Sequence, residues 1–588
     1  MQTSARTPLL ASSRRSEESQ RSDDRADEED EALLNESSQR RLSGAPTINR
    51  LREILLFLWA LLATAALIIL AVWMQHSQQT HPPPSKPGHS SHKRNLIFMV
   101  SDGMGPASLS LTRSYRQYVL DLPINDTLTL DRHFWGTSRT RSSNSLVTDS
   151  AAGATAFSCG RKSYNGAIAM LPDYTPCGTV LEAAKRAGYI TGMVVTTDIT
   201  DATPACFASH VNFRVQNDEI AMHEVGEGPL GRVVDLMFGG GRCHFLPNST
   251  EGSCRLDDVD VTKIAQKKHG WSYFDTRAGF DSLWGGNNVT LPSLGLFAST
   301  DVPFEIDRKN MSDVYPSLGE MANTALRALE KATKDSDKGF FLMIEGSRID
   351  HAGHINDPAA QVREVLEYDR TMRAVLDFIE ASDTETVMVA TSDHETGGLS
   401  TALQEPGHLP VYNWYPKALA QAQASAERLT QLLLEHVDEM RSAGKPESKS
   451  SLKNWINTKL VIPKLGITDA REHELQQLAS SPETALVTFS DMISLRAHVG
   501  WSTHGHSAVD VNIYSSGGPG TEAIRGNVEN TDVGKFLREY LNVDVDDITK
   551  ELNEKMDIQK LKSLAAVEGP DGHMDVELKT FAASAGTS

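Results

Sequence analysis

A chain of 588 residues is too long for one small domain and predicts several structural units or one large domain with insertions. Its composition, 39% hydrophobic and 23% charged, excludes a collagen, a coiled coil and a wholly disordered chain. The net charge of -20 opposes a polyanionic backbone and no basic stripe offsets it, so nucleic acid is excluded from the expected partners.

The N-terminal region predicts a membrane anchor. Residues 1–53 are rich in Ser, Arg and acidic residues and are expected to form a disordered cytosolic tail. Residues 54–74 carry no charge and are long enough to cross a bilayer, which predicts a single transmembrane signal-anchor helix. A cleaved signal peptide fits less well because no small-residue cleavage site follows. Several Arg residues precede the segment and Lys86 is the first basic residue after it, which predicts a type II orientation.

Two shorter segments complete this region. Residues 75–94 are rich in Pro, His and Ser and predict an extended stem. In the cytosolic tail, Glu29 precedes Leu33 and Leu34 with the spacing of an acidic dileucine sorting signal, a short pattern that also arises by chance. A sorting adaptor is therefore one expected partner.

The rest of the chain is expected in a lumen or outside the cell. All five cysteines follow the predicted span, in keeping with an oxidising compartment. Four sequons predict N-glycosylation, at Asn125, Asn248, Asn288 and Asn310. Cys243 and Cys254 bracket a short loop and are the candidate disulfide, although the sequence does not fix the connectivity. The odd count leaves at least one thiol free or in an intermolecular bond.

Four apolar runs end in acidic residues or His. The runs, at 95–100, 189–197, 339–344 and 386–391, are followed in turn by Asp102, by Asp198, Asp201 and Thr203, by Glu345, and by Asp393 and His394. Helical stretches at 178–187, 317–333 and 358–380 separate the runs, so the sequence predicts a parallel α/β sheet with helices on both faces. In such sheets the site lies beyond the carboxyl ends of the strands.

Carboxylates gathered in this way repel one another unless a cation lies between them, which predicts a metal centre. Asp350 and His354 are four residues apart, so a helical turn would place both on one face as ligands. His504 supplies another imidazole in W-S-T-H-G-H, although His506 could equally be the donor. Ser150 precedes a run of small residues where a helix is expected to begin. The free backbone N–H groups in the first turn of this helix would favour an anion. An ordinary Ser N-cap is the alternative for Ser150.

Six ordered motifs resemble those of the alkaline phosphatases, in particular the membrane-anchored fungal vacuolar type. They are S-D-G-M-G, V-T-D-S-A-A-G-A-T, T-D-A-T-P-A, E-G-S-R-I-D-H-A-G-H, T-S-D-H-E-T-G-G and T-H-G, and the likeness covers residues 95–540. The resemblance implies a catalytic domain at 95–545 that forms a three-layer α/β/α sandwich around a mostly parallel sheet. It also implies hydrolysis of phosphate monoesters through a phosphoserine, with broad specificity at neutral to alkaline pH. The resemblance also implies two zinc ions and one magnesium ion per chain, and a homodimer.

The resemblance assigns a role to each matching residue. Ser150 matches the nucleophile, Arg214 the residue that binds the phosphate, and Asp149 a residue that orients this Arg. The implied ligands are Asp350, His354 and His504 for the first zinc, Asp102, Asp393 and His394 for the second zinc, and Asp102, Thr203 and Glu345 for magnesium. Asp201 and His351 depart from the family pattern, since bacterial members combine Asp with Lys and animal members have His at both places. We expect Asp201 to order water around magnesium and His351 to lie near the phosphate without binding zinc.

Two further segments and the alternatives complete the predictions. Residues 400–500 have helical periodicity and predict a helical insertion, whereas residues 546–588 predict a mobile C-terminal tail. A sulfatase or phosphodiesterase fits less well because the sulfatase C/S-x-P-x-R motif is missing, and an inactive receptor fits less well because every implied ligand is present in the sequence. The expected location is a vacuolar membrane with a lumenal catalytic domain, and a plasma-membrane ectoenzyme is the alternative.

Overall fold

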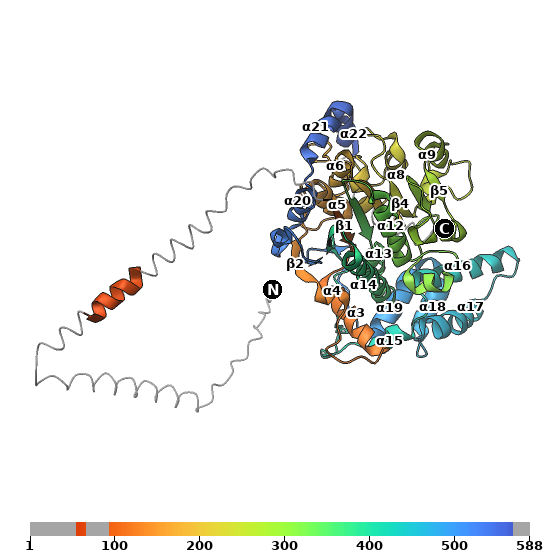
Figure 1. Cartoon of the computed structure of the whole chain (residues 1–588). Coiled ribbons are helices and arrows are strands. Elements are labelled where there is room, and N and C mark those ends of the chain that lie inside the picture. The colour runs from red at the N-terminus through yellow and green to blue at the C-terminus, as the bar shows by residue number, and fades with distance from the viewer. Residues whose placement is uncertain (1–54, 66–92, 569–588) are drawn as a thin grey trace, which may run out of the picture. The chain divides into compact units, whose positions relative to one another are not determined.

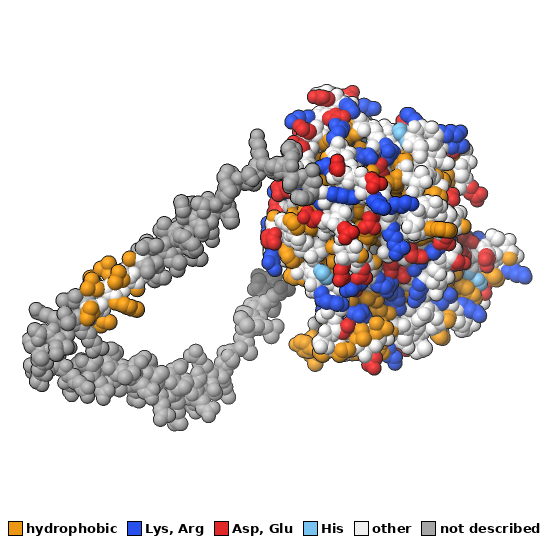
Figure 2. Space-filling model, in the orientation of Figure 1, with side chains coloured by type: hydrophobic (Ala, Val, Ile, Leu, Met, Phe, Trp, Pro, Cys, Tyr) orange, Lys and Arg blue, Asp and Glu red, His pale blue; other side chains and the backbone are white. Residues whose placement is uncertain are grey.

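The computed structural model describes residues 55–65 and 93–568, with side chains up to residue 563. The chain divides into two units, Met1–Ser90 and Ser91–Ser588. In the first unit, residues 55–65 form a helix whose apolar side chains are largely exposed (Figure 2). Among the residues described, no helix combines the length and apolar character needed to cross a membrane. The other residues of the predicted span, the cytosolic tail with Glu29, Leu33 and Leu34, and residues 75–92 of the stem lie outside the described residues.

A ten-stranded sheet forms the centre of the second unit, with the order β12-β2-β11-β8-β1-β7-β3-β4-β6-β5 (Figure 1). β11 is antiparallel to its neighbours β2 and β8, and the other pairs of this sheet are parallel. The mostly parallel α/β fold expected from the sequence is therefore confirmed. The strands are β1 (Arg94–Val100), β2 (Phe134–Arg139), β3 (Ile190–Asp198), β4 (Leu236–Gly240), β5 (Ser272–Phe274), β6 (Ser293–Leu296), β7 (Phe340–Glu345), β8 (Glu385–Thr391), β11 (Val511–Ser515) and β12 (Gly526–Glu529).

Alternating side chains of β1 pack against helices on opposite faces of the sheet. Leu96, Phe98 and Val100 share a core with α5, α6 and α20, whereas Ile97 and Met99 share one with α3, α12 and α14. The helices therefore form the two outer layers (Figure 1). These helices are α3 (Pro106–Val119), α5 (Ser150–Cys159), α6 (Val180–Arg186), α12 (Leu318–Thr333), α14 (Pro358–Ala381) and α20 (Asn530–Leu541).

Short helices connect the layers. α7 and α13 matter most for the site, because they follow β3 and β7 directly. The connecting helices are α4 (Thr129–Arg132), α7 (Ala202–Ala208), α8 (Asn217–Met222), η1 (His223–Glu227), α9 (Val261–His269), α10 (Arg277–Asp281), α11 (Glu305–Arg308) and α13 (Arg348–His354).

A helical subdomain lies between β9 (Glu395–Thr396) and β10 (His506–Ser507), two short strands that pair with each other. Its helices share a hydrophobic core with α3 and α14 and lie together in Figure 1. Arg348 of α13 donates a hydrogen bond to Glu427 of α16 at 2.7 Å, which ties this subdomain to the helix that carries Asp350 and His354. The helices are α15 (Pro416–Gln421), α16 (Ala426–Ser442), α17 (Lys449–Trp455), η5 (Ile456–Leu465), α18 (Glu472–Ser480) and α19 (Ala485–Ala497).

The sequence predicts a tail at residues 546–588, and the structure places residues 546–568 of this segment largely in two helices, α21 (Val545–Lys555) and α22 (Ile558–Glu568). Val545, Ile548 and Leu552 lie on one face of α21 and are buried in a cluster with Ala183 of α6. Asp544 caps α21 by accepting two backbone N–H bonds. Polar composition concealed this narrow apolar stripe. Residues 569–588 lie outside the described residues.

The second unit contains two disulfides. Cys243–Cys254 is the pair expected from the sequence, and Cys159–Cys177 was not expected. The Cys159–Cys177 disulfide joins the end of α5 to the segment before α6. Cys206 is free and buried, which accounts for the odd count.

Candidate functional site

The expected site residues come from the carboxyl ends of neighbouring strands. Asp102 follows β1, Glu345 ends β7, and Asp393 follows β8. These three strands are adjacent and parallel, so their carboxyl ends meet at one edge of the sheet. β3 is the next strand along this edge, and it leads into α7, whose N-cap is Asp201.

Asp102, Asp393 and His394 form a fully buried group whose ligand-type atoms all lie within 4.8 Å of one another. Nε2 of His394 is 3.1 Å from Oδ2 of Asp393 and 3.7 Å from Oδ1 of Asp102. Burial and the nearby carboxylates of Asp393 and Asp350 raise the pKa of Asp102 well above its ordinary value. Burial also opposes ionisation of Asp393, but the adjacent His394 ring holds its pKa below the ordinary value.

Thr203 and Glu345 lie beside the same carboxylate. The hydroxyl of Thr203 donates to Oδ2 of Asp102 at 3.5 Å, and the hydroxyl of Ser347 donates to Glu345 at 2.8 Å. Burial and the charge of Asp201 raise the pKa of Glu345 to about 8. Thr203 belongs to α7, and its hydroxyl and these carboxylates are oxygen donors of the kind that a hard cation such as magnesium prefers.

A second group contains Asp350, His394 and His506. Nε2 of His354 lies 3.2 Å from Oδ2 of Asp350 and also 3.2 Å from Nε2 of His506. Although burial acts in the opposite direction, the rings of His354 and His506 hold the pKa of Asp350 well below its ordinary value. The ring of His506 also stacks on that of His394, with 3.4 Å between centroids.

His506 therefore occupies the place expected for His504. Nδ1 of His504 faces the backbone carbonyl of His354 at 2.7 Å, and His504 is in none of the three ligand groups found among the described residues. The cause is the pairing of β10 with β9, which sets His506 opposite Thr396. The hydroxyl of Thr396, a residue that the sequence did not single out, donates to Oδ1 of Asp350 and lies 3.2 Å from Nδ1 of His394.

Ser150 begins α5, as the sequence predicts. Its N-cap is Asp149, whose Oδ1 accepts from the N–H of Ala152 at 2.9 Å. Oγ of Ser150 lies 3.0 Å from Nε2 of His394, so the hydroxyl faces the metal-ligand residues. A Cβ on Gly153 would be 2.9 Å from Cβ of Asp393, so only glycine allows this close approach of α5.

Two carboxylates hold Arg214, and one of them is Asp149, the N-cap of the helix that starts at Ser150. Nη2 of Arg214 is 2.9 Å from Oδ1 of Asp201, and Nη1 is 3.6 Å from Oδ2 of Asp149. Asp149 also caps the helix that starts at Ser150, and its Oδ2 accepts from the N–H of Gly166 at 2.7 Å. The guanidinium of Arg214 is therefore tied to the residue that precedes Ser150, and a guanidinium can bind two oxygens at once.

His351 has a partner that the sequence did not predict. Its Nδ1 lies 3.2 Å from Oδ2 of Asp301, in the loop after β6. Burial opposes ionisation of Asp301, but Arg348 and His351 hold its pKa well below the ordinary value. The stretch G-L-F-A-S-T-D has the pattern of an apolar run ending in an acid, so the rule that found Asp102 could also have found Asp301.

The two ligand groups fit divalent cations. Oδ1 of Asp102 and Oδ2 of Asp393 are buried, and neither has a hydrogen-bond partner among the described residues. Buried carboxylate oxygens without a hydrogen bond are costly, and a cation between them would remove both the repulsion and the missing bonds. Imidazole and carboxylate together suit zinc, and the hydroxyl and carboxylates around Thr203 suit magnesium.

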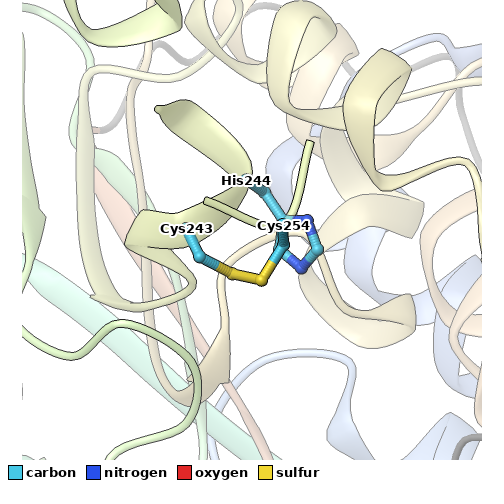
Figure 3. A group of neighbouring side chains, drawn as sticks. All are labelled: Cys243, His244 and Cys254. Atoms are coloured by element: carbon cyan, nitrogen blue, oxygen red, sulfur yellow. A yellow bond between two sulfur atoms is a disulfide. The ribbon is translucent and has the colours of Figure 1, made fainter. Parts of the chain in front are cut away.

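A third group of ligand-type residues, Cys243, His244 and Cys254, is not a metal site in this state. The two sulfurs are bonded to each other (Figure 3), so they offer no thiolate. Nε2 of His244 lies instead 3.0 Å from Oδ2 of Asp198.

The sequence model of the family described as alkaline phosphatase matches residues 93–543. The chain belongs to the alkaline phosphatase family. It is 55% identical over 480 residues to the repressible alkaline phosphatase of Saccharomyces cerevisiae, covering 78% of this chain and 83% of that protein. It is 46% identical over 471 residues to the alkaline phosphatase of Schizosaccharomyces pombe, covering 79% and 85% respectively.

Solved structures of bacterial members share the fold. The cold-active alkaline phosphatase of a Shewanella species has 30% sequence identity and a TM-score of 0.62, over 76% of this chain and 99% of that one. The Thermus thermophilus alkaline phosphatase has 25% identity and a TM-score of 0.63, over 81% and 99%. The family expected from the six motifs is therefore confirmed.

Proposed function

We propose that this chain hydrolyses phosphate monoesters to an alcohol and inorganic phosphate, through a phosphoserine at Ser150 and with broad specificity at neutral to alkaline pH. The observation that carries the proposal is the Ser150 hydroxyl at the start of α5, 3.0 Å from His394 and within the group of metal-ligand residues. Membership of the alkaline phosphatase family supports it.

The residues divide the reaction between them. Oγ of Ser150 loses its proton and attacks phosphorus; the bond from phosphorus to Oγ forms as the bond to the alcohol oxygen breaks, and the alcohol takes up a proton. Arg214 binds two of the remaining phosphate oxygens, and Asp149 and Asp201 hold it in place. A water molecule then attacks the phosphoserine, the bond to Oγ breaks, and Ser150 regains a proton. Of the substrate, Arg214 would contact only the phosphate, and this favours broad specificity for the alcohol.

We propose two zinc ions and one magnesium ion per chain. Asp350, His354 and His506 would hold one zinc, Asp102, Asp393 and His394 the other, and Asp102, Thr203 and Glu345 the magnesium. Bound zinc lowers the pKa of a coordinated hydroxyl and neutralises developing charge on the departing oxygen. A structure of an alkaline phosphatase variant from the Antarctic bacterium TAB5 is described with Mg bound, which supports a magnesium site in this family. His351 would lie near the phosphate, and Asp201 would order water around magnesium.

We further propose a type II protein of a vacuolar membrane, anchored by residues 54–74 and sorted through Glu29, Leu33 and Leu34, with a homodimeric lumenal domain. The apolar side chains of residues 55–65 and the two disulfides support an anchor and an oxidising lumen. All four sequon asparagines, Asn125, Asn248, Asn288 and Asn310, are exposed, as glycosylation requires. Acidic and basic side chains are interspersed on the face shown in Figure 2, which does not favour nucleic acid.

Hydrolysis of p-nitrophenyl phosphate at several pH values tests the proposed function, with the purified full-length chain loaded with zinc and magnesium. Activity is expected to disappear with a chelator, to return with metal, and to fall by at least about a thousandfold in Ser150→Ala. Ser158→Ala, at the other end of α5, is the matched control and should retain activity. Activity of Ser150→Ala within tenfold of the control, in roughly equal protein amounts, would contradict the nucleophile assignment.

A further inference from the structure

Asp301 has a fixed position because the sheet holds its loop. The N–H of Val302 donates to the carbonyl of Thr196 at 2.9 Å, and the carbonyl of Val302 accepts from Nη1 of Arg348 at 3.0 Å. Oδ1 of Asp301 itself accepts from the N–H of Asp198 at 3.1 Å. Thr196 and Asp198 belong to β3, so one carboxylate oxygen is tied to the strand that leads into the site.

The other oxygen, Oδ2, faces His351 at 3.2 Å from Nδ1. An ionised carboxylate can only accept a hydrogen bond, so a carboxylate at this distance favours the proton on Nδ1. The ring is thereby held through one nitrogen, and Nε2 is the nitrogen that Asp301 leaves available. His351 directly follows Asp350 on α13 and is 30% exposed, so Asp301 orients a ring that lies beside the metal-ligand residues and is open to a ligand.

We propose that Asp301 is a positioning residue: it fixes the orientation of His351, and through this ring it strengthens the binding of the substrate phosphate. The inference rests on the proposed function. Two other acidic residues at this edge already have partners: Asp201 is bound to Arg214 at 2.9 Å, and Asp198 lies 3.0 Å from Nε2 of His244. Asp301 is thus the acidic residue that faces His351, and it acts without touching the phosphate.

The experiment is a double-mutant cycle on the metal-loaded full-length chain, with the affinity for inorganic phosphate measured by calorimetry and by competitive inhibition. Asp301→Ala should weaken phosphate binding about tenfold, as expected for one hydrogen bond to a charged group. The same substitution in a His351→Ala background should change it less than about twofold, because the residue through which Asp301 acts is gone. An equal loss in both backgrounds would overturn the proposal.

The contact itself has a spectroscopic readout. Proton–nitrogen NMR of histidine-labelled protein should show a hydrogen-bonded Nδ1–H signal that is absent in His351→Ala. Asp301→Asn keeps the acceptor for Asp198 N–H, and therefore the loop, but turns an NH2 group toward Nδ1, so the signal should vanish. Persistence of the signal in Asp301→Asn would also overturn the proposal.

One control separates this effect from a general loosening of α13. Asp301 also lies 3.7 Å from Nη1 of Arg348, whose other acidic partner is Glu427 at 2.7 Å. Glu427→Gln should leave phosphate affinity and the Nδ1–H signal unchanged, and a tenfold loss of affinity in this control would assign the effect to Arg348 instead. If the wild-type chain hydrolyses no phosphate monoester, the proposed function fails, whereas the signal and the phosphate titration still decide the role of Asp301.

Discussion

Gly103 is the position at which one added methyl group tests the site most directly. Its φ is +74°, and a Cβ there would lie 2.6 Å from Cα and 2.9 Å from Oδ1 of Asp350. A left-handed backbone costs a non-glycine residue about 1 kcal/mol, and forcing a methyl group into packed space costs about 1–3 kcal/mol. We therefore expect Gly103→Ala to lower the free energy of unfolding by about 2–4 kcal/mol and to displace Asp350 from the metal-ligand group.

Gly252→Ala is the matched control for this prediction. Gly252 has a φ of +77° and no heavy atom within 4 Å of an added Cβ, so only the backbone cost of about 1 kcal/mol applies. Urea unfolding gives the stability of each variant, and metal competition gives its zinc affinity. Gly103→Ala should bind zinc at least about tenfold more weakly, and Gly252→Ala should bind it normally. Equal stability and equal zinc affinity in the two variants would refute the packing of Asp350 against the turn after β1.

Three further outcomes follow from the site and its surroundings. In a metal-competition assay, His506→Ala should weaken zinc binding by at least about a hundredfold and His504→Ala by less than about tenfold. The reverse order would show that His504 is the ligand. In the metal-free protein the folded state keeps a proton on Glu345 up to a pKa of about 8, against 4.5 for an ordinary Glu, so the thermal midpoint should fall as pH rises between these values; a flat midpoint would contradict the burial of this carboxyl. Burial raises the pKa of the Cys206 thiol to about 12, so a thiol reagent should label no cysteine in the native chain and one after unfolding without reductant, and labelling of the native chain would show that Cys206 is accessible.

Much of the site could be predicted because one topological rule brings distant residues together. Asp102, Glu345 and Asp393 are far apart in the chain, but each follows or ends an apolar run, and parallel strands place such ends at one edge. The helix that begins at Ser150 was likewise visible in its run of small residues. The local sequence pattern was sufficient to predict these residues, because the direction of the parallel strands alone brings their side chains together.

His506 could not be chosen in the same way. His504 and His506 are two residues apart and each carries an imidazole, so their spacing in the sequence does not distinguish them. The choice is made by the pairing of β10 with β9, which sets His506 opposite Thr396 and thereby beside Asp350. A two-residue strand that pairs across the whole helical subdomain leaves no periodic signal in the sequence. α21 was missed for a similar reason: only three of its residues are apolar and buried, and the polar residues between them dominate the composition of the segment.

Sequence also does not show which acidic residues at this edge bind a cation and which hold other side chains. Asp198 and Asp301 follow apolar runs just as Asp102 does, but in the structure Asp198 faces His244 and Asp301 faces His351. Asp102 has instead a buried oxygen without a hydrogen-bond partner in the described chain, and its pKa is raised by burial and by neighbouring carboxylates. A cation stabilises a carboxylate such as Asp102 far more than one such as Asp198 or Asp301. The reason is that it relieves the repulsion between Asp102 and the neighbouring carboxylates, whereas Asp198 and Asp301 already face a His ring. Removal of metal should therefore disturb Asp102 and its neighbours while the contact between Asp301 and His351 persists.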